Sequence, residues 1–191
     1  MSGAPDLAEA AEAADNVVLL GAGGEVVGAA PRAAVHTTTT PRHLGFSVYL
    51  FNDAGQLLIT RRALSKRTWP GVWTNTCCGH PRPGEELEAA IERRLWDELG
   101  MAAVELSCVL PDFDYTATDA SGIVENESCP VFESRLANPH STISANPAEV
   151  MDWRWVRWND LARAVRLTPF AFSPWSVRQI GLLDAIGEHA E

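Results

Sequence analysis

GHPRPGEELEAAIERRLWDELG, residues 79–100, is the stretch that says most about the fold of this chain. Its second part predicts a helix over residues 85–100, which Gly100 ends. Four apolar residues recur there at the spacing of one helical face: Leu87, Ala90, Ile91 and Leu95. Glu98 lies eleven residues after Leu87, which is about three turns of 3.6 residues. It therefore falls on the same inward-facing stripe.

The position of Glu98 predicts a cation site on this helix. A carboxylate that faces the interior costs free energy unless a metal ion or another cation neutralises it. The alternative is a salt bridge to Arg94, which lies four residues earlier on the same helix.

The same stretch is similar to the Nudix box, whose pattern is G-x5-E-x7-R-E-U-x-E-E-x-G-U. The residues that keep the pattern are Gly79, Glu85, Arg93, Glu98 and Gly100. Two positions depart from it, since Arg94 stands where a glutamate is expected and Asp97 replaces the first of the paired glutamates. Nudix hydrolases use the missing glutamate to bind catalytic metal, so the departure counts against diphosphate hydrolysis.

The composition predicts one globular domain. The chain has 191 residues, of which 46% are hydrophobic and 21% charged, and this is enough apolar material for a full core over residues 16–191. Residues 1–15 are acidic and rich in alanine, and we expect a disordered or frayed tail there.

Charge and hydropathy also exclude several classes of protein. A net charge of −10 argues against nucleic-acid or membrane-surface binding. No apolar run approaches the ~20 residues that a membrane-spanning helix needs. The N-terminus lacks the basic start and apolar core of a signal peptide. We expect a cytoplasmic protein without nucleic-acid or membrane partners, either a monomer or a weak dimer.

The rest of the chain predicts strands, with helices between and after them. The expected strands lie within residues 16–30, 43–63, 107–136 and 150–158. A short helix capped by Asn159 or Asp160 follows, and a last helix runs from about 174 to 187. This order predicts a mixed α+β fold. With the box it predicts an α/β/α Nudix-like sandwich, in which helices flank a mixed sheet.

Histidines and paired carboxylates predict a metal site. His36, His43 and His80 fall near the ends of expected strands, while Glu125 and Glu127 share one face of a strand and would repel each other without a metal or a proton. Three imidazoles and two carboxylates suit octahedral Mn²⁺ or Mg²⁺ better than a tetrahedral structural zinc. The alternatives are ordinary satisfied histidines and a solvated edge strand.

Two further groups of residues carry side chains suited to binding or catalysis. Arg62 and Lys66, in a basic cluster at 61–67, are suited to clamp a phosphate group, although a solvated basic turn is the alternative. Cys77 and Cys78 directly precede Gly79, and no CxxC pair exists in the chain, so neither a zinc knuckle nor a disulfide framework is indicated. The pair is then part of a metal site, a nucleophile with its base, or a packed turn.

Five segments together resemble one enzyme family, the type 1 isopentenyl-diphosphate isomerases. They are TRRALSK (60–66), WPGVWTN (69–75), CGHP (78–81), SGIVENE (121–127) and AFSPW (171–175). The resemblance covers residues 17–186 and implies a Nudix-like α/β fold. It also implies an isomerase that supplies isoprenoid biosynthesis by interconverting isopentenyl and dimethylallyl diphosphate, through protonation, a tertiary carbocation and deprotonation.

The resemblance implies two metal ions and a diphosphate site. The residues that would hold the first divalent ion, Mn²⁺ or a similar metal, are His36, His43, His80, Glu125 and Glu127. Glu98 would bind a second ion, Mg²⁺, that bridges to the diphosphate. Arg32 stands where many relatives have lysine, which keeps the charge but changes the geometry of a diphosphate contact.

The resemblance also implies the catalytic groups. Cys78 and Glu127 would handle the protons, Tyr115 would assist Glu127, and Trp175 would face the hydrocarbon end of the substrate. Cys77 would be a packing residue. Two competing interpretations are a Nudix hydrolase of nucleoside diphosphates, which would not need Cys78, and a non-catalytic Nudix-like binding module.

Overall fold

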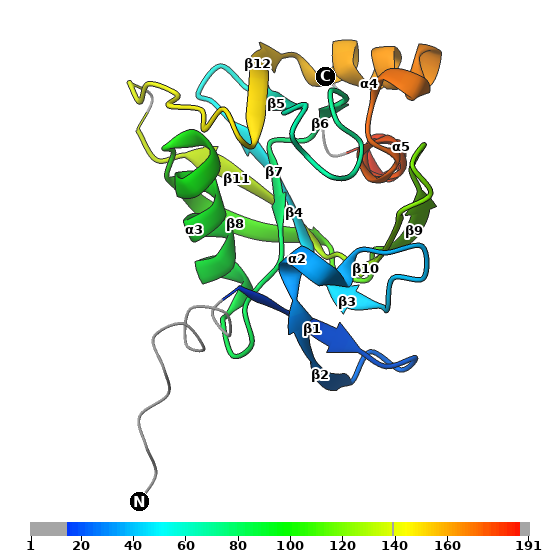
Figure 1. Ribbon diagram of the computed structural model, residues 1–191. Coiled ribbons are helices and arrows are strands. Elements are labelled where there is room, and N and C mark those ends of the chain that lie inside the picture. The colour runs from blue at the N-terminus through cyan, green and yellow to red at the C-terminus, as the bar shows by residue number, and fades with distance from the viewer. Residues whose placement is uncertain (1–14, 139, 188–191) are drawn as a thin grey trace, which may run out of the picture.

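The computed structural model of the protein describes residues 15–138 and 140–187, and its strands form two sheets (Figure 1). The five-stranded sheet has the order β2-β1-β3-β10-β9. Its strands are β1 (Asn16–Leu20), β2 (Val26–Pro31), β3 (His43–Leu44), β9 (Asp114–Thr118) and β10 (Val124–Ser128). The tail expected over residues 1–15 lies, apart from Asp15, outside the described residues.

The second sheet has the order β12-β5-β4-β11-β8, with β6 beside β5 and β7 beside β4. Its strands are β4 (Phe46–Phe51), β5 (Leu57–Arg62), β6 (Trp73–Thr74), β7 (Cys77–Gly79), β8 (Ala103–Leu110), β11 (Val131–Leu136) and β12 (Val150–Val156). The helices are α2 (Arg32–Val35), α3 (Leu87–Leu99), α4 (Trp158–Leu167), the 3-10 turn η1 (Pro169–Ala171) and α5 (Pro174–Ile186).

Two chain segments, 43–51 and 124–136, run parallel to each other through both sheets. β3 pairs with β10 in the first sheet and β4 pairs with β11 in the second. The chain passes from one sheet to the other at Gly45 and again at Cys129–Pro130. Backbone hydrogen bonds join the two crossings, from Gly45 N to Ser128 O at 2.8 Å and from Ser47 N to Pro130 O at 3.1 Å. The sheets therefore meet at a bend in a shared strand pair.

Helices cover both faces of the seven-stranded sheet, as the expected sandwich requires (Figure 1). All of β4 is buried, and its side chains point alternately into two hydrophobic cores, one on each face of the sheet. Phe46, Val48 and Leu50 pack with α3, whereas Tyr49 and Phe51 pack with α4 and α5. Fully burying one such side chain contributes roughly 1.5–3 kcal/mol to the stability of the fold. The buried side chains of β4 therefore hold α3 on one face of the sheet and α4 and α5 on the other.

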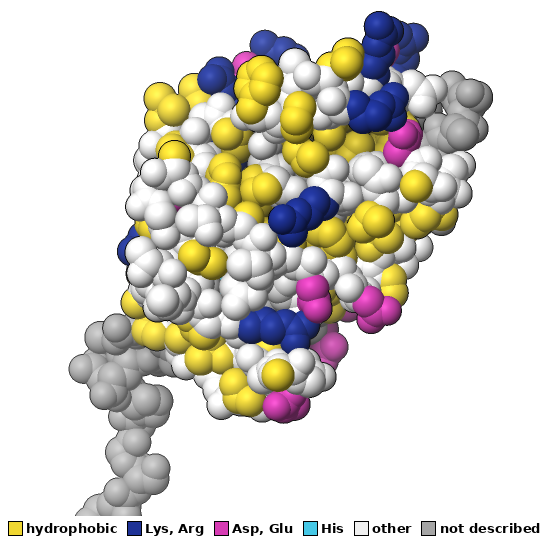
Figure 2. Space-filling model, turned by 90° about the vertical axis from the view of Figure 1, so that its right-hand side faces the viewer, with side chains coloured by type: hydrophobic (Ala, Val, Ile, Leu, Met, Phe, Trp, Pro, Cys, Tyr) yellow, Lys and Arg dark blue, Asp and Glu magenta, His cyan; other side chains and the backbone are white. Residues whose placement is uncertain are grey.

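Figure 2 shows hydrophobic side chains gathered on the face that carries α5 and β9. A groove there is lined by Phe113, Val177 and Leu182 among others, and none of the residues expected to act on substrate lines it.

No helix in the described part of the chain is long and apolar enough to cross a membrane.

α3, the helix of the Nudix-box stretch, is as expected except at its start. It begins at Leu87 rather than at residue 85, because the carboxylate of Glu85 accepts hydrogen bonds from Arg82 N at 2.8 Å and from Arg93 Nε at 2.7 Å. It ends at Gly100, whose φ of 62° is the left-handed conformation that glycine favours. Glu98 is buried on the inward face with Leu95, as the spacing predicted.

One other local prediction was wrong. α4 begins at Trp158 with Arg157 as its N-cap residue, and neither Asn159 nor Asp160 caps it, since Asp160 instead accepts a hydrogen bond from Arg157 Nε at 2.7 Å. The segment expected as strands over 107–136 does form strands; there are four, beginning at Ala103, and they are shared between the two sheets.

Candidate active site

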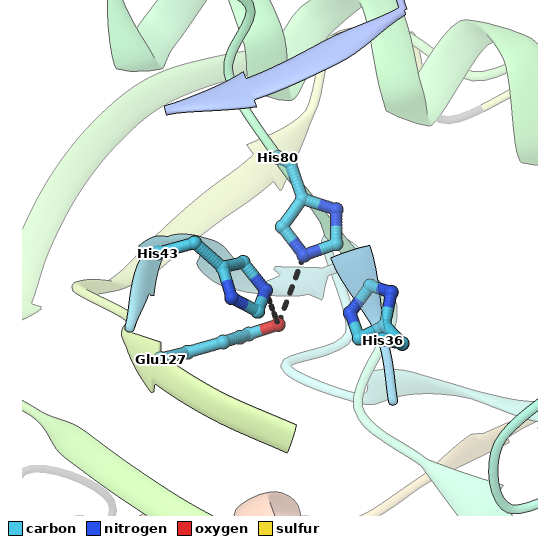
Figure 3. A group of neighbouring side chains, drawn as sticks. All are labelled: His36, His43, His80 and Glu127. Atoms are coloured by element: carbon cyan, nitrogen blue, oxygen red, sulfur yellow. Dashed lines mark hydrogen bonds and ion pairs between the residues drawn. The ribbon is translucent and has the colours of Figure 1, made fainter. Parts of the chain in front are cut away.

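Three imidazoles and one carboxylate meet where the two sheets bend (Figure 3). His36 follows α2, His43 lies in β3, His80 follows β7 and Glu127 lies in β10. One potential ligand atom from each lies within 4.8 Å of the others. The centroids of the imidazole rings are 5.0–5.5 Å apart. The structure thus brings four of the five expected ligands into one cluster.

Glu127 is placed by strand register. It lies opposite His43 in the parallel pair β3–β10, and its Oε1 is 2.9 Å from His80 Nε2 and 3.4 Å from His43 Nε2. A Cβ on Gly45 would lie 2.5 Å from Glu127 Oε2, so only glycine leaves room for this carboxylate. Burial raises the pKa of Glu127, but the neighbouring imidazoles of His80 and His43 outweigh it and hold the pKa well below its usual range.

Glu125 joins the cluster from the same face of β10. Its Oε2 lies 2.9 Å from His36 Nε2, and its Oε1 accepts a hydrogen bond from Thr68 Oγ1 at 2.9 Å. Only 6% of Glu125 and 7% of Glu127 is exposed, so a solvated edge strand is the wrong interpretation of this segment.

The donor atoms of this cluster fit a divalent cation. His36 Nε2, His43 Nε2 and Glu125 Oε2 are buried and make no hydrogen bond, even though His36 Nε2 and Glu125 Oε2 are only 2.9 Å apart. His43 Nδ1 lies 2.9 Å from the carbonyl of Pro41. A carbonyl only accepts, so Nδ1 carries a proton, and the neutral form of this imidazole presents the lone pair of Nε2 to the cluster. Burial lowers the pKa of His80, which favours its neutral, metal-binding form.

The two adjacent cysteines point to opposite sides of β7. Cys77 is buried in the core beside α3, where burial raises its pKa well above the usual range. Cys78 packs with the other core, and its thiol donates to Asn75 Oδ1 at 3.1 Å and lies 3.4 Å from Ser47 Oγ. Burial raises the pKa of Cys78 to about 11, so the thiol holds its proton at neutral pH. The alternation of a strand thus separates a packing thiol from one that lines the cavity.

Asn75 holds the groups around Cys78 in place. Its Oδ1 also accepts from Trp175 Nε1 at 3.2 Å, while its Nδ2 donates to the carbonyls of Val48 at 3.1 Å and Cys77 at 2.8 Å. The indole N–H only donates, which fixes the orientation of the amide. Asn75 is fully buried, and the sequence showed it only as part of a matching segment.

Trp175 lies among other aromatic rings. Its ring centroid is 5.8 Å from that of Tyr115 and 5.5 Å from that of Trp69, and the guanidinium of Arg62 lies 5.3 Å from it. Tyr115 faces Glu127 across the β9–β10 pair, and burial raises its pKa well above the usual range. A neutral phenol therefore lies beside the cluster.

These groups line one cavity of about 330 Å³. Its chemically distinctive wall residues are Cys78, Tyr115, Glu125, Glu127, Trp175, Arg32, Arg62, Lys66, Arg94 and Glu149. A second cavity of about 30 Å³, between Cys77, Glu98 and Glu149, is large enough for one water molecule or ion. Every residue expected to act on substrate or metal therefore lines one of these cavities, except His43, which is fully buried within the cluster.

The cationic side chains already have partners in the protein. Arg62 donates to the carbonyl of Thr68 at 2.9 Å, and Arg32 is exposed and pairs with Asp15 at 2.9 Å. Lys66 forms an ion pair with Glu149.

Glu98 forms the salt bridge with Arg94 that was the alternative to a cation site. Burial raises the pKa of Glu98, and the charge of Arg94 opposes that shift. Arg94 also reaches Glu149, at 3.3 Å. Arg94 was not predicted as a wall residue, because in the sequence it is only a departure from the box. Glu149 was not predicted either, because no pattern surrounds it.

Comparisons with known proteins show the family to which the chain belongs. The sequence model of the NUDIX domain matches residues 41–176. A protein from Frankia alni named isopentenyl-diphosphate Delta-isomerase is 56% identical, over 87% of this chain and 84% of the relative. One of the same name from Mycolicibacterium vanbaalenii is 52% identical, over 92% of this chain and 95% of the relative. The chain belongs to the isopentenyl-diphosphate Delta-isomerase family.

Solved structures place this isomerase family member in the same fold as other NUDIX proteins. A crystal structure from Deinococcus radiodurans superposes with a TM-score of 0.64 at 22% identity, covering 86% of this chain and 96% of that one. A MutT protein from Methanosarcina mazei gives 0.57 at 15% identity, covering 78% and 96%. The predicted mixed α+β fold is thereby confirmed.

Proposed function

We propose that this protein is an isomerase that interconverts isopentenyl diphosphate and dimethylallyl diphosphate. One observation carries the proposal: a thiol, Cys78, and a carboxylate, Glu127, line the same cavity as the indole of Trp175 and several cationic side chains. The name shared by the relatives supports the same pair of substrates.

The proton chemistry rests on Cys78 and Glu127. Moving the double bond by one position adds a proton to one alkene carbon and removes a proton from another, so the formula of the substrate is unchanged. Two positioned acid–base groups are needed. The raised pKa of Cys78 keeps its thiol protonated, while the lowered pKa of Glu127 keeps its carboxylate ionised. The pair thus offers one proton donor and one acceptor.

Aromatic side chains and burial protect the intermediate. A tertiary carbocation is attracted to the face of an indole, more strongly where water is excluded. Trp175 is 3% exposed and Tyr115 is 6% exposed, so little water reaches their rings to capture the cation. Tyr115, opposite Glu127 in the β9–β10 pair, would assist that carboxylate as it exchanges its proton.

Two metal ions are part of the proposal. His36, His43, His80, Glu125 and Glu127 would hold the first, with Mn²⁺ or Mg²⁺ suited to these nitrogen and oxygen donors. Glu98 would hold a second ion, Mg²⁺, whose charge would stabilise the diphosphate. When bound, these ions supply positive charge that neutralises the buried carboxylates and the diphosphate oxygens.

Basic side chains hold the diphosphate so that it does not leave as the cation forms. Lys66 lines the main cavity, and Arg32 and Arg62 line it as well. Arg62 is fixed by the carbonyls of Thr68 and Trp69, so its remaining donor atoms are held in one orientation. A diphosphate that binds Arg32 would compete with the carboxylate of Asp15, which pairs with this guanidinium.

A product assay tests the function directly. Purified protein incubated with isopentenyl diphosphate and Mg²⁺ is expected to yield the acid-labile allylic diphosphate without release of inorganic phosphate. Release of phosphate or pyrophosphate without allylic product would instead support a Nudix hydrolase. Folded, metal-loaded protein that does neither would support a binding module.

Substitution of Trp175 is expected to lower turnover in the order Trp, Phe, Leu. Phenylalanine keeps an aromatic face with a weaker quadrupole, while leucine removes it, and each ~1.4 kcal/mol of lost cation stabilisation is about tenfold in rate. KM should change less, because ground-state binding rests on the diphosphate. Equal turnover in the Trp175→Phe and Trp175→Leu variants, both folded and metal-loaded, would leave Trp175 only a packing role.

A further inference from the structure

Glu149 lies between two cations at the wall of the cavity. It is the last residue before β12, and its side chain is 17% exposed. Its carboxylate pairs with the ammonium of Lys66 through Oε2 and lies 3.3 Å from Arg94 Nη2 through Oε1. One carboxylate therefore contacts a cation from the 61–67 loop and a cation from α3.

The backbone around Glu149 is fixed to the segments that carry both cations. Its carbonyl accepts from Ala63 N at 2.9 Å, at the start of the loop that carries Lys66. Its N–H donates to the carbonyl of Asn146 at 3.0 Å, and Asn146 N donates to the carbonyl of Glu98 at 2.8 Å, at the end of α3. The carboxylate is thus supported from both sides.

The same nitrogen of Arg94 is shared between two carboxylates. Arg94 Nη2 pairs with Glu98 Oε1 and also reaches Glu149 Oε1. A cation that binds Glu98 competes with Arg94 for that carboxylate, and Glu149 is then the partner that still holds the guanidinium. Burial raises the pKa of Glu149, but the charges of Lys66 and Arg94 outweigh it, so the pKa is lowered and Glu149 is ionised at neutral pH.

We propose that Glu149 is a positioning residue for the diphosphate. Its carboxylate keeps the ammonium of Lys66 and the guanidinium of Arg94 at the cavity wall when a divalent cation occupies Glu98. Lys66 is a flexible side chain, and ordering such a chain costs conformational entropy, a cost that Glu149 removes from the binding step. The inference rests on the proposed function, since it assumes that a diphosphate enters this cavity.

Binding of inorganic pyrophosphate to the whole protein with Mg²⁺, measured by calorimetry, tests the proposal without turnover. The Glu149→Gln variant keeps the size of the side chain and is expected to bind pyrophosphate about tenfold more weakly, because the hydrogen bond that orders Lys66 loses its charge. KM for isopentenyl diphosphate should rise by a similar factor while kcat changes little. Glu149→Asp, which keeps the charge, should restore part of the loss.

Two controls separate positioning from charge and from general stability. Glu92→Gln removes the same charge from the exposed side of α3 and should leave pyrophosphate binding unchanged. In a Lys66→Met background, Glu149→Gln should have a smaller effect, because the two act through each other. Additive effects of the two substitutions would contradict the proposal.

Unchanged or tighter binding of pyrophosphate by the Glu149→Gln variant would point to a different role for Glu149. If Glu149 only repels the anion, Glu149→Gln should bind pyrophosphate equally well or more tightly, and that result would overturn the inference. If Glu149→Gln does not fold, Glu149→Asp decides, since binding equal to that of the original protein would also overturn it. Failure of the original protein to bind pyrophosphate with Mg²⁺ would count against the proposed function itself.

Discussion

The Cys78→Ala variant is expected to lose isomerase activity by about 10²–10⁴-fold, the usual contribution of a positioned acid–base group. The thiol of Cys78 is held by Asn75 Oδ1 at 3.1 Å and lines the main cavity. Its removal takes away one of the two proton-handling groups, while the metal cluster and Trp175 stay in place. Product formation from isopentenyl diphosphate measures kcat, and elemental analysis checks that metal is retained.

Cys77→Ala is the matched control for that experiment. Cys77 lies on the opposite side of the same strand and is buried against α3, so its loss should lower stability more than turnover. Thiol-alkylating reagents should inactivate the original protein slowly at neutral pH, because the raised pKa of Cys78 leaves little thiolate. Substrate should slow inactivation further. Equal loss of activity in both alanine variants would mean that the roles of the two cysteines are wrongly assigned.

Removal of metal is expected to lower the melting temperature by roughly 5–10 °C. A ligand present at 100 times its Kd stabilises the folded state by ≈ 2.7 kcal/mol, and for a chain of this size each kcal/mol is about 2–4 °C. Without the ion, the buried carboxylates Glu125 and Glu127 also lose a neutralising charge. Thermal melts with and without a chelator measure the difference.

His43→Ala should abolish that difference. The variant loses a fully buried nitrogen ligand, so it should hold little metal and melt at the same temperature with and without chelator. His140→Ala is the control, because His140 is exposed and should leave both metal content and the chelator effect unchanged. A His43→Ala protein that retains one metal ion per chain and full activity would show that the cluster is not the metal site.

The parts of the fold that could be predicted are those with local signals. The box helix has an apolar stripe and a glycine stop, and the structure confirms the burial of Glu98 that its spacing predicted. Its first residue was wrong because Glu85 turns back to Arg93, a contact between residues eight apart that no propensity contains. The Asn159 or Asp160 cap failed for a similar reason, since Asp160 pairs with Arg157.

The division into two sheets could not be predicted, because it depends on pairing between distant strands. Gly45 separates β3 from β4, and the sequence showed it only as one residue of a continuous apolar run. The role of Gly45 becomes clear only when Glu127, 82 residues later, lies against it.

For the candidate site, the sequence predicted which histidines and carboxylates lie close together, and the roles of these residues stay predictions. Asn75 and Glu149 were missed because Trp175, which Asn75 contacts, and Lys66 and Arg94, which Glu149 contacts, are adjacent to them only in the folded chain. Short polar side chains without periodicity give no signal of such contacts.

The bend between the sheets has a consequence for the order of folding. The hairpins β1–β2 and β9–β10 join near neighbours in the chain, whereas the β3–β10 pair joins residues 84 positions apart and must close a long loop. The metal ligands assemble only when that pair has formed, which places the cluster late on the folding pathway. Interactions absent from the transition state act on the rate of unfolding. We therefore expect a bound cation to extend the lifetime of the native state while leaving the speed of folding almost unchanged.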